Sequence, residues 1–241
     1  MARFFHDGAL QPGARIELGP ELARHVRVLR LRPGEEIILF DGRGGEYPAR
    51  LERQDRGGVQ VALGEHRPFE RESPLQVALL QGLSTSERMD LTIQKSVELG
   101  VAAIQPVLAG KSVVRLDAER AAAKLAHWRR VAISACEQCG RNRIPAIEAP
   151  VTVSDYCSSA SGEGARILLS PEGGSTLKGC LAPGVAALTL AVGPEGGFDA
   201  GEEKLFAQAG FAAVRLGPRV LRTETAAPAA LAALAALSGE F

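Results

Sequence analysis

Three segments of the chain are richer in glycine, proline and charged residues than simple connections require. They are residues 170–174 (SPEGG), 193–198 (GPEGGF) and 216–225 (LGPRVLRTET). Each follows an apolar run that predicts a β-strand, and the carboxyl ends of parallel strands share one edge of a sheet, where open α/β sheets bind ligands. The spacing therefore predicts one ligand site built from all three segments.

The second segment narrows the chemistry of this ligand. It has neither the Gly-Lys-Ser/Thr ending of a Walker loop nor the Gly-x-Gly-x-x-Gly pattern of dinucleotide-binding folds, which argues against ATP and NAD. The glycines let a ligand approach the backbone closely, whereas Glu195 beside them would repel a phosphate. A ligand without phosphates is favoured, and the alternative is a tight strand-to-helix turn that binds nothing.

The third segment carries two arginines, a glutamate and two threonines just before an apolar run. Thr223 or Thr225 as a helix N-cap accounts for one hydroxyl group. An N-cap does not account for Arg219 and Arg222. Residues 141–143 (Arg-Asn-Arg) form a second basic cluster, which suits contacts with phosphates and bases, although a solvated loop is the alternative.

The remaining reactive residue types support neither metal nor redox chemistry. Cys136 and Cys139 form one Cys-x-x-Cys pair, but Cys157 and Cys180 stand alone, and zinc sites of this kind need a second pair. The four histidines are scattered without a carboxylate cluster. We therefore expect no metal site and interpret the cysteine pair as packed helical residues.

Composition describes an ordinary globular protein with an uneven charge distribution. The 241 residues carry no formal net charge, yet Arg24, Arg27, Arg30 and Arg32 lie within nine residues and form a local basic stripe that could bind phosphates. The longest uncharged stretches fall short of the roughly 18 residues that span a bilayer, so no membrane helix is expected. The amino terminus lacks the pattern of a secretory signal, which favours a cytoplasmic location.

The hydrophobic pattern divides the chain into two parts. Residues 1–72 alternate short strand-like runs with turns and contain one helical stretch at 20–29, which predicts a small β-barrel unit. From residue 73 the pattern changes to apolar strands alternating with helices, which predicts a mostly parallel sheet covered by helices. The strands are expected at 75–80, 103–108, 165–170, 187–192 and 213–216, and the helices at 86–99, 117–138, 199–209 and 224–238.

Several of these segments, taken in order along the chain, resemble one known family. GPEGGF at 193–198 and LGPRVLRTETA at 216–226 are similar to the SPOUT-class RNA methyltransferases of the RsmE family, which methylate N3 of a uridine in small-subunit (16S) ribosomal RNA. Residues 25–42 (HVRVLRLRPGEEIILFDG), 89–101 (MDLTIQKSVELGV) and 135–145 (ACEQCGRNRIP) also resemble that family. The likeness covers nearly the whole chain.

The resemblance implies a fold and a cofactor. Residues 1–72 would form a PUA-like, RNA-binding barrel, and residues 73–241 an α/β SPOUT domain with a C-terminal trefoil knot near 193–222. The family acts as a homodimer, with the site at the subunit interface, and binds S-adenosylmethionine in the knot. Matched by position, the cofactor-binding residues would be Leu169, Ser170, Gly193, Glu195, Gly196, Gly197, Leu216, Gly217, Val220 and Leu221.

The chemistry of uridine methylation suggests roles for three further residues. The N3 proton has a pKa well above neutrality, so transfer needs that proton removed or the developing negative charge stabilised. We expect Arg222 to stabilise this charge, Arg219 to bind a phosphate or the same base, and Glu224 to accept the proton or hold Arg222. RNA contacts are expected from the following basic residues: Arg24, Arg27, Arg30, Arg88, Lys95, Arg141 and Arg143.

Two alternatives remain from the sequence. The protein could be a SPOUT methyltransferase that acts on transfer RNA or on a 2′-hydroxyl group. It could instead be a non-catalytic RNA-binding or ribosome assembly factor with the same fold, although that class would tolerate a degraded cofactor loop, and GPEGG and LGPRVLR are intact.

Overall fold

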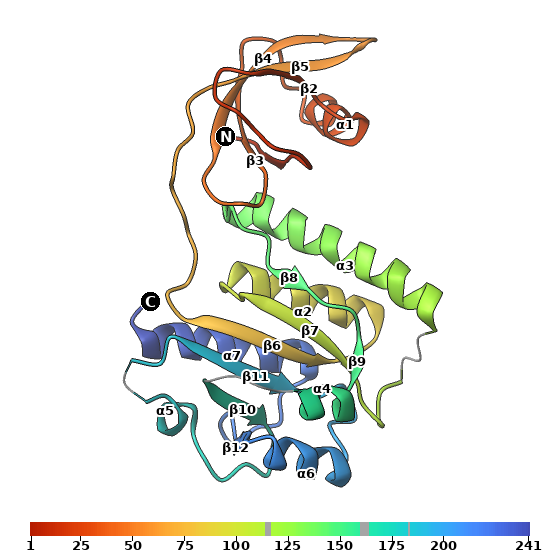
Figure 1. Cartoon of the computed structure of the whole chain (residues 1–241), viewed down its shortest axis with the longest axis vertical. Helices are drawn as coiled ribbons and strands as arrows, with labels where there is room; N and C mark the ends of the chain where they lie inside the picture. Colours follow the sequence, from red (N-terminus) through yellow and green to blue (C-terminus); the bar gives the residue numbers. More distant parts are fainter. Residues whose placement is uncertain (114–116, 160–163, 183) are drawn as a thin grey trace. The chain divides into compact units, whose positions relative to one another are not determined.

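The computed structural model describes residues 1–113, 117–159, 164–182 and 184–241 (Figure 1). These residues divide into two compact units. The first unit comprises Met1–Glu72 together with Cys136–Ile144, and the second comprises Ser73–Ala135 and Pro145–Phe241.

The first unit is a five-stranded sheet with one helix. The strand order is β1-β3-β4-β5-β2, with β1 parallel to β3 and the other neighbours antiparallel. Alternation of buried and half-buried residues along β5 gives this sheet one face against the core, as expected for a period of two. The strands are β1 (Arg3–Phe5), β2 (Arg15–Glu17), β3 (Glu36–Phe40), β4 (Tyr47–Asp55) and β5 (Gly58–Leu63).

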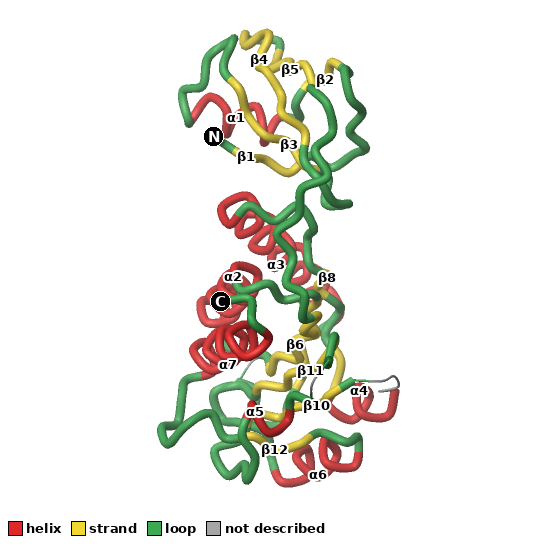
Figure 2. Tube along the Cα trace, turned by 90° about the vertical axis from the view of Figure 1, so that its left-hand side faces the viewer, coloured by secondary structure: helices red, strands yellow, loops and turns green. Residues whose placement is uncertain are grey.

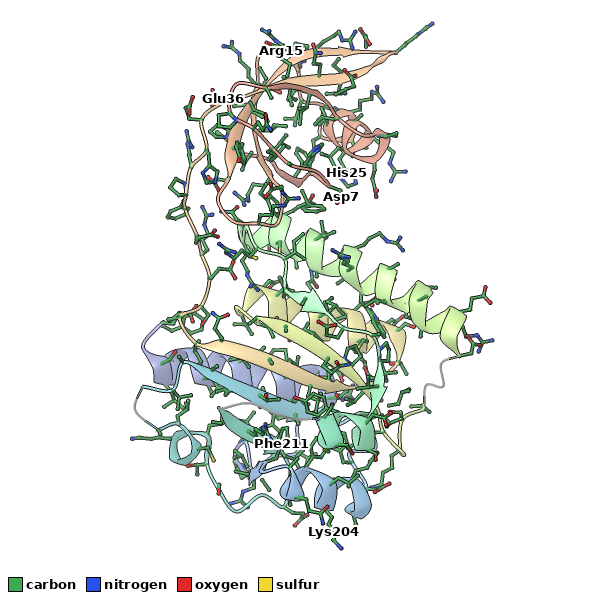
Figure 3. All side chains as sticks on the ribbon, in the orientation of Figure 1. Asp7, Arg15, His25, Glu36, Lys204 and Phe211 are labelled. Carbon is green, nitrogen blue, oxygen red and sulfur yellow. The ribbon has the colours of Figure 1, made fainter. Side chains whose placement is uncertain are left out.

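Helix α1 (Pro20–Val28) confirms the helical stretch expected in this unit. Pro20 opens the helix, where its missing N–H costs nothing, and Ala23 and Val26 are buried against the sheet. The arginines of the helix lie on the opposite, exposed side. Arg15 and Glu36, on the strands of the same unit, are labelled in Figure 3.

The second unit is built on a parallel sheet with the order β12-β10-β11-β6-β7-β8, and β9 also pairs with β7. The predicted strands are confirmed, whereas the two-residue strands β8 and β9 were too short to predict. The strands are β6 (Gln76–Gly82), β7 (Ala103–Leu108), β8 (Ala146–Ile147), β9 (Val151–Thr152), β10 (Ala165–Leu169), β11 (Ala187–Val192) and β12 (Ala212–Val214).

Helices cover both faces of this sheet. Helices α2 and α7 pack together on one side and α4 and α6 on the other (Figure 2). The four expected helices are confirmed, and the short helices α4 and α5 were not predicted. The helices are α2 (Ser86–Glu98), α3 (Ala118–Cys139), α4 (Val153–Ser159), α5 (Leu177–Cys180), α6 (Ala200–Gln208) and α7 (Thr223–Ser238).

Local sequence explains how α6 is fixed near the carboxyl edge of the sheet. The Asp199 carboxylate accepts a hydrogen bond from the Glu202 N–H at 2.9 Å, and the Glu202 carboxylate accepts one from the Asp199 N–H, which forms a capping box. Phe206 packs edge-on against Phe198 and Phe211 in the core of this unit (Phe211 is labelled in Figure 3). The loop that ends in Phe198 is thereby anchored at its far end.

In the described part of the chain, none of the helices combines the length and the apolar character that crossing a bilayer requires.

Candidate active site

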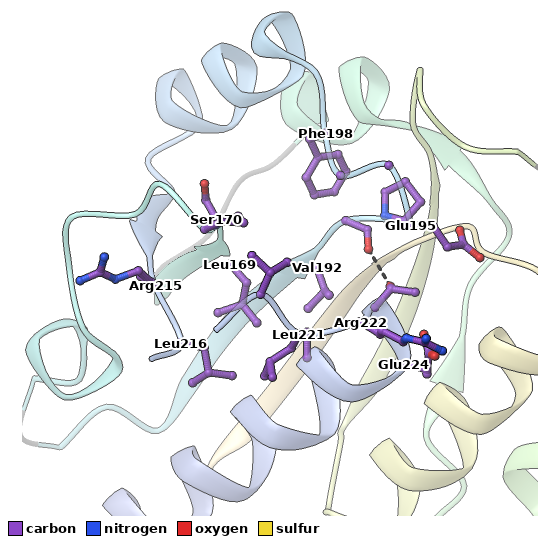
Figure 4. Close-up of a pocket in the computed structure, with 18 of the residues that line it drawn as sticks. Leu169, Ser170, Val192, Glu195, Phe198, Arg215, Leu216, Leu221, Arg222 and Glu224 are labelled. Atoms are coloured by element: carbon purple, nitrogen blue, oxygen red, sulfur yellow. Dashed lines mark hydrogen bonds between the residues drawn. The ribbon is translucent and has the colours of Figure 1, made fainter. Parts of the chain in front are cut away.

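The three segments predicted to converge do so around a cavity of about 600 Å³ at the carboxyl ends of β10, β11 and β12 (Figure 4). The lining includes every residue that was expected to bind the cofactor or act in catalysis. Arg88, Pro171, Val192, Phe198, Glu203 and Arg215 also line it. Only the first residues of the SPEGG segment, Ser170 and Pro171, reach the cavity.

The cavity has an apolar middle and polar ends. Figure 4 shows Leu169, Leu216 and Leu221 along its centre, with Arg222 towards one end and Arg215 towards the other. Such an arrangement suits a flat, uncharged ring in the middle and polar groups at the ends.

The backbone of the cavity wall offers hydrogen-bond donors. Gly197 and Gly217 have φ angles of +68° and +76°, which explains why glycine is required at both positions. Within the residues that the structure describes, the backbone N–H groups of Leu216, Gly217, Val220 and Leu221 have no protein acceptor. A ligand can use these donors.

A buried hydrogen-bond chain fixes the wall beside Arg222. The Gln81 side chain donates to the Thr223 hydroxyl at 2.9 Å, and Thr223 donates to the Gly193 carbonyl at 2.7 Å. Thr223 and Gln81 are both buried. The chain ties β6, the loop after β11 and the first residue of α7 together, so Arg222 extends from a rigid support.

This hydrogen-bond chain corrects one expectation. Neither Thr223 nor Thr225 is the N-cap of α7, because Arg222 occupies that position and makes no side-chain capping bond. The Thr223 hydroxyl instead holds Gly193. The only sequence signal for this role is Gln81, a polar residue at the end of an apolar strand.

Arg88 joins two carboxylates of the cavity. Its Nη1 lies 3.0 Å from Glu195 Oε1, and its Nε lies 3.7 Å from Glu224 Oε1. The Thr85 N–H also donates to Glu195 Oε1 at 3.0 Å. Burial alone would raise the pKa of Glu195, but the Thr85 N–H and the Arg88 guanidinium outweigh it and hold the pKa below its usual range. Glu195 is therefore a stable carboxylate.

These pairs change the interpretation of two predicted residues. Arg88 was expected to contact RNA, but it belongs to the cavity wall and is engaged by both carboxylates. Glu224 was expected to hold Arg222 or accept a proton, and within the described residues its ion pair is with Arg88, not Arg222.

Arg219 and Arg222 have exposed side chains and, among the residues described, no carboxylate within 4 Å. Both can donate to a substrate.

The structure also separates the two arginines of the Arg-Asn-Arg turn. Arg141 is only 3% exposed and forms an ion pair with Glu72 inside the first unit. An RNA contact for Arg141 is therefore a wrong expectation, because its guanidinium is enclosed by protein. Arg143 has 56% of its side chain exposed and lies 3.4 Å from Glu70, so its RNA contact stays a prediction.

The other cations expected to contact RNA are accessible. Arg24, Arg27 and Arg30 are exposed on α1 and the turn that follows it, and Arg27 donates to the Asp55 carbonyl at 3.1 Å. Lys95 forms an ion pair with Glu98 on α2 at 2.9 Å, and 43% of its side chain is exposed. Their RNA contacts remain predictions.

Both members of the Cys-x-x-Cys pair lie in α3 as free thiols, Cys136 buried and Cys139 half-buried. Cys136 is fully buried, which raises the pKa of its thiol to about 12, and its Sγ lies 3.6 Å from the Arg143 carbonyl. Among the residues that the structure covers, no group of three or more histidine, cysteine, aspartate and glutamate side chains is placed to hold a metal ion.

Comparison with known families identifies both parts of the chain. Residues 71–235 match a family described as an RNA methyltransferase domain, and residues 18–63 match a family described as an RNA methyltransferase PUA domain. The fold of the second unit and its cavity thus correspond to a methyltransferase family.

Curated relatives extend this similarity over nearly the full chain. Ribosomal RNA small subunit methyltransferase E of Buchnera aphidicola (subsp. Acyrthosiphon pisum) is 39% identical over 90% of this chain and 85% of its own length. The protein of the same name from Mycobacterium tuberculosis is 34% identical over 92% of this chain and 86% of its own length.

Solved structures show the same similarity over nearly the whole chain. A ribosomal RNA small subunit methyltransferase E from Neisseria gonorrhoeae, bound to S-adenosyl methionine, is 40% identical with a TM-score of 0.92 and 98% coverage of both chains. A putative methyltransferase from Legionella pneumophila in complex with the same cofactor is 41% identical with a TM-score of 0.92, covering 98% of this chain and 97% of the other. This chain belongs to the ribosomal RNA small subunit methyltransferase E family.

Proposed function

We propose that this protein transfers a methyl group from S-adenosylmethionine to N3 of a uridine in 16S (small-subunit) ribosomal RNA. The observation that carries the proposal is the cavity of the second unit, in which all three predicted segments meet. Two relatives about 40% identical to this chain have been crystallised with S-adenosylmethionine, and curated relatives are named as small-subunit ribosomal RNA methyltransferases.

The cavity residues fit S-adenosylmethionine. The apolar middle formed by Leu169, Leu216 and Leu221 suits the faces of an adenine ring, and the unpaired N–H donors of residues 216–221 suit its ring nitrogens. The Oε2 atoms of Glu195 and Glu224 are buried and, within the described residues, have no hydrogen-bond partner. Carboxylates near the cavity also suit a cofactor that carries positive charge and no phosphate.

The chain's own residues perform the remaining chemistry. When bound, S-adenosylmethionine supplies an electrophilic methyl group on a positively charged sulfur. Arg222 donates hydrogen bonds to a uracil carbonyl and stabilises the negative charge that develops as the N3–H bond breaks. Arg219 binds a phosphate or the same base. Together these two arginines would hold the uracil so that N3 faces the methyl group that the bound cofactor would supply.

Glu224 is the proposed acceptor of the N3 proton. Its Oε1 faces Arg88, whereas its Oε2 is buried with no hydrogen-bond partner among the described residues. Arg88 therefore orients the carboxylate, and Oε2 is available to accept a proton. Glu224 follows Arg222 by two residues, which brings the proposed acceptor and the proposed charge-stabilising group to the same end of the cavity (Figure 4).

Further proposals follow from membership of the family. Residues 1–72 form a PUA-like RNA-binding barrel and residues 73–241 a SPOUT domain whose segment 193–222 is threaded as a trefoil knot. The protein acts as a cytoplasmic homodimer on the RNA alone or on the assembled small subunit. Exposed cations of the first unit, among them Arg24, Arg27 and Arg30, support RNA binding by that unit.

One measurement tests the proposed function directly. Purified protein is incubated with labelled S-adenosylmethionine and small ribosomal subunits that lack their own modification, and the methylated nucleoside is identified by mass spectrometry. We expect N3-methyluridine. A different methylated nucleoside would overturn the target position while leaving the methyltransferase activity, and an absence of cofactor binding would overturn the enzymatic function in favour of a non-catalytic RNA-binding factor.

A further inference from the structure

Phe69 is an exposed aromatic residue on a firmly held backbone. Its side chain is 52% exposed, although its carbonyl accepts a hydrogen bond of 2.6 Å from the fully buried side chain of Asn142. Asn142 is itself held by Arg3, which donates to its Oδ1 at 2.6 Å. The Phe69 side chain is thus presented to solvent from a backbone that buried polar contacts hold in place.

The residues beside Phe69 are held in the same way. Arg71 lies over the Phe69 ring, with its guanidinium carbon 4.4 Å from the ring centroid, and donates to the Gly140 carbonyl at 2.8 Å. Arg141 forms an ion pair with Glu72, which fixes the chain three residues beyond Phe69. Contacts from the Arg-Asn-Arg turn therefore hold the backbone of residues 69–72 in place.

Three more arginines lie on backbone segments that pair with one another in the first unit: Arg43, Arg67 and Arg143. The backbone of Arg67 is paired with Glu46 through two hydrogen bonds of 2.8 and 2.9 Å, and the backbone of Arg43 forms a bridge with Arg143. The side chains of all three arginines are exposed. Among the described residues, Arg43 and Arg67 have no carboxylate within 4 Å, so their charge is available to a partner.

We propose that these residues form a binding surface for a single-stranded segment of RNA, on which one base stacks against Phe69 and the neighbouring phosphates contact the arginines. This surface, here called the Phe69 surface, consists of Arg43, Arg67, Phe69, Arg71 and Arg143, all in the first unit. The inference deepens the proposed function, on which the identity of the partner as RNA rests.

Charge and shape favour RNA over a protein partner. Within residues 41–72 and 136–144, all of which the structure describes, Phe69 is the one exposed large hydrophobic residue. The surface therefore lacks the apolar area of a protein interface. A lone aromatic ring among arginines matches the pattern by which proteins bind single strands, because bases stack on the ring and guanidinium groups neutralise phosphates. Double-stranded RNA would keep its bases stacked and could not use the ring.

The test measures binding of the full-length protein to a short fluorescein-labelled oligouridine at several salt concentrations. We expect Phe69→Ala to weaken binding about tenfold and Phe69→Trp to retain it, because stacking needs an aromatic face. Phe69→Leu should behave like Phe69→Ala, which separates stacking from simple apolar contact. Phe241→Ala is the matched control, since Phe241 is 73% exposed in the second unit.

The arginines give a second, independent signal. A plot of log affinity against log salt concentration has a negative slope. Arg67→Ala should make this slope less steep by about 1, as the loss of one phosphate contact does. Equal affinities of Phe69→Ala and Phe241→Ala would overturn the inference. So would failure of the wild-type protein to bind oligouridine at low salt.

The methyl-transfer assay on small subunits separates this inference from the proposed function. If the wild-type protein transfers no methyl group while oligouridine binding depends on Phe69, the proposed function fails and the surface stands. If the wild-type protein methylates the subunits while Phe69→Ala leaves both oligouridine affinity and the KM for subunits unchanged, the inference fails and the proposed function stands.

Discussion

The cavity of the second unit and the Arg-Asn-Arg turn of the first unit distribute their arginines in contrasting ways. In the cavity, the single residue Arg88 engages both Glu195 and Glu224, which leaves Arg222 without a carboxylate partner among the described residues. In the turn, the buried Arg141 forms an ion pair with Glu72, and the side chain of Arg143 remains largely exposed. An arginine becomes structural or available according to which neighbour already holds the nearby carboxylates.

The largest expected effect tests the free arginine of the cavity. Arg222→Ala should lower kcat for methylation of small subunits by about a hundredfold or more, because removing one donor that stabilises developing charge has this effect in other enzymes. Binding of S-adenosylmethionine, measured by calorimetry, should change little. Arg53→Ala is the control, since Arg53 is exposed and pairs with Glu17 in the other unit. Activity of Arg222→Ala within a few-fold of wild type would contradict the role.

The next prediction contrasts the two arginines of the turn. Arg141→Ala should destabilise the first unit by about 3 kcal/mol, because it removes a buried charge that pairs with Glu72. Arg143→Ala should change its stability by no more than about 0.5 kcal/mol. Hydrogen exchange of the β3 and β4 amides reports this difference locally. If Arg141→Ala instead weakened RNA binding without loss of protection, the assignment of Arg141 as structural would be wrong.

A smaller effect is expected at Arg88. Arg88→Ala should lower kcat about tenfold, because the released carboxylates of Glu195 and Glu224 would attract Arg222 away from the substrate. Arg88→Lys should restore part of the activity, since one ammonium can pair with one of the two carboxylates. Steady-state kinetics separates kcat from the KM for RNA. An increase in KM alone, with a smaller salt dependence, would support the RNA contact first expected from the sequence.

The smallest predicted effect is the pH dependence contributed by Glu195. Its pKa in the folded protein lies below the ordinary value of 4.5, so its stabilising contribution is fully present above that pH and is lost as the pH falls through the folded value. Glu195→Gln should therefore be less stable than wild type at neutral pH, by under about 1 kcal/mol because Arg88 is partly exposed.

Urea denaturation of wild type and Glu195→Gln across acidic pH measures this difference. The gap in unfolding free energy should narrow below pH 4.5 and close at lower pH. A gap that stays constant or widens on acidification would show that the carboxylate of Glu195 is not stabilised by its Thr85 and Arg88 contacts.

The sequence predicted the elements that position the cavity better than it predicted the partners of individual side chains. Apolar runs located the longer strands and helices, whereas β8, β9 and the short helices α4 and α5 contain too few residues to show a period. Arg141 and Arg143 look equivalent in sequence, because both flank Asn142 in a loop. Thr223 looked like a helix cap, and its bond to Gly193 depends on a residue 30 positions away.

The sequence by itself determined where a ligand would bind, because parallel strands followed by Gly- and Pro-rich loops must present those loops at one edge of the sheet. It also carried the segments that place the chain in its family. Only the tertiary structure decided which cations stay free. The Arg88–Glu195 pair joins residues 107 positions apart, and the Arg141–Glu72 pair joins residues 69 apart. Such pairs form after the elements pack, so no local pattern specifies them.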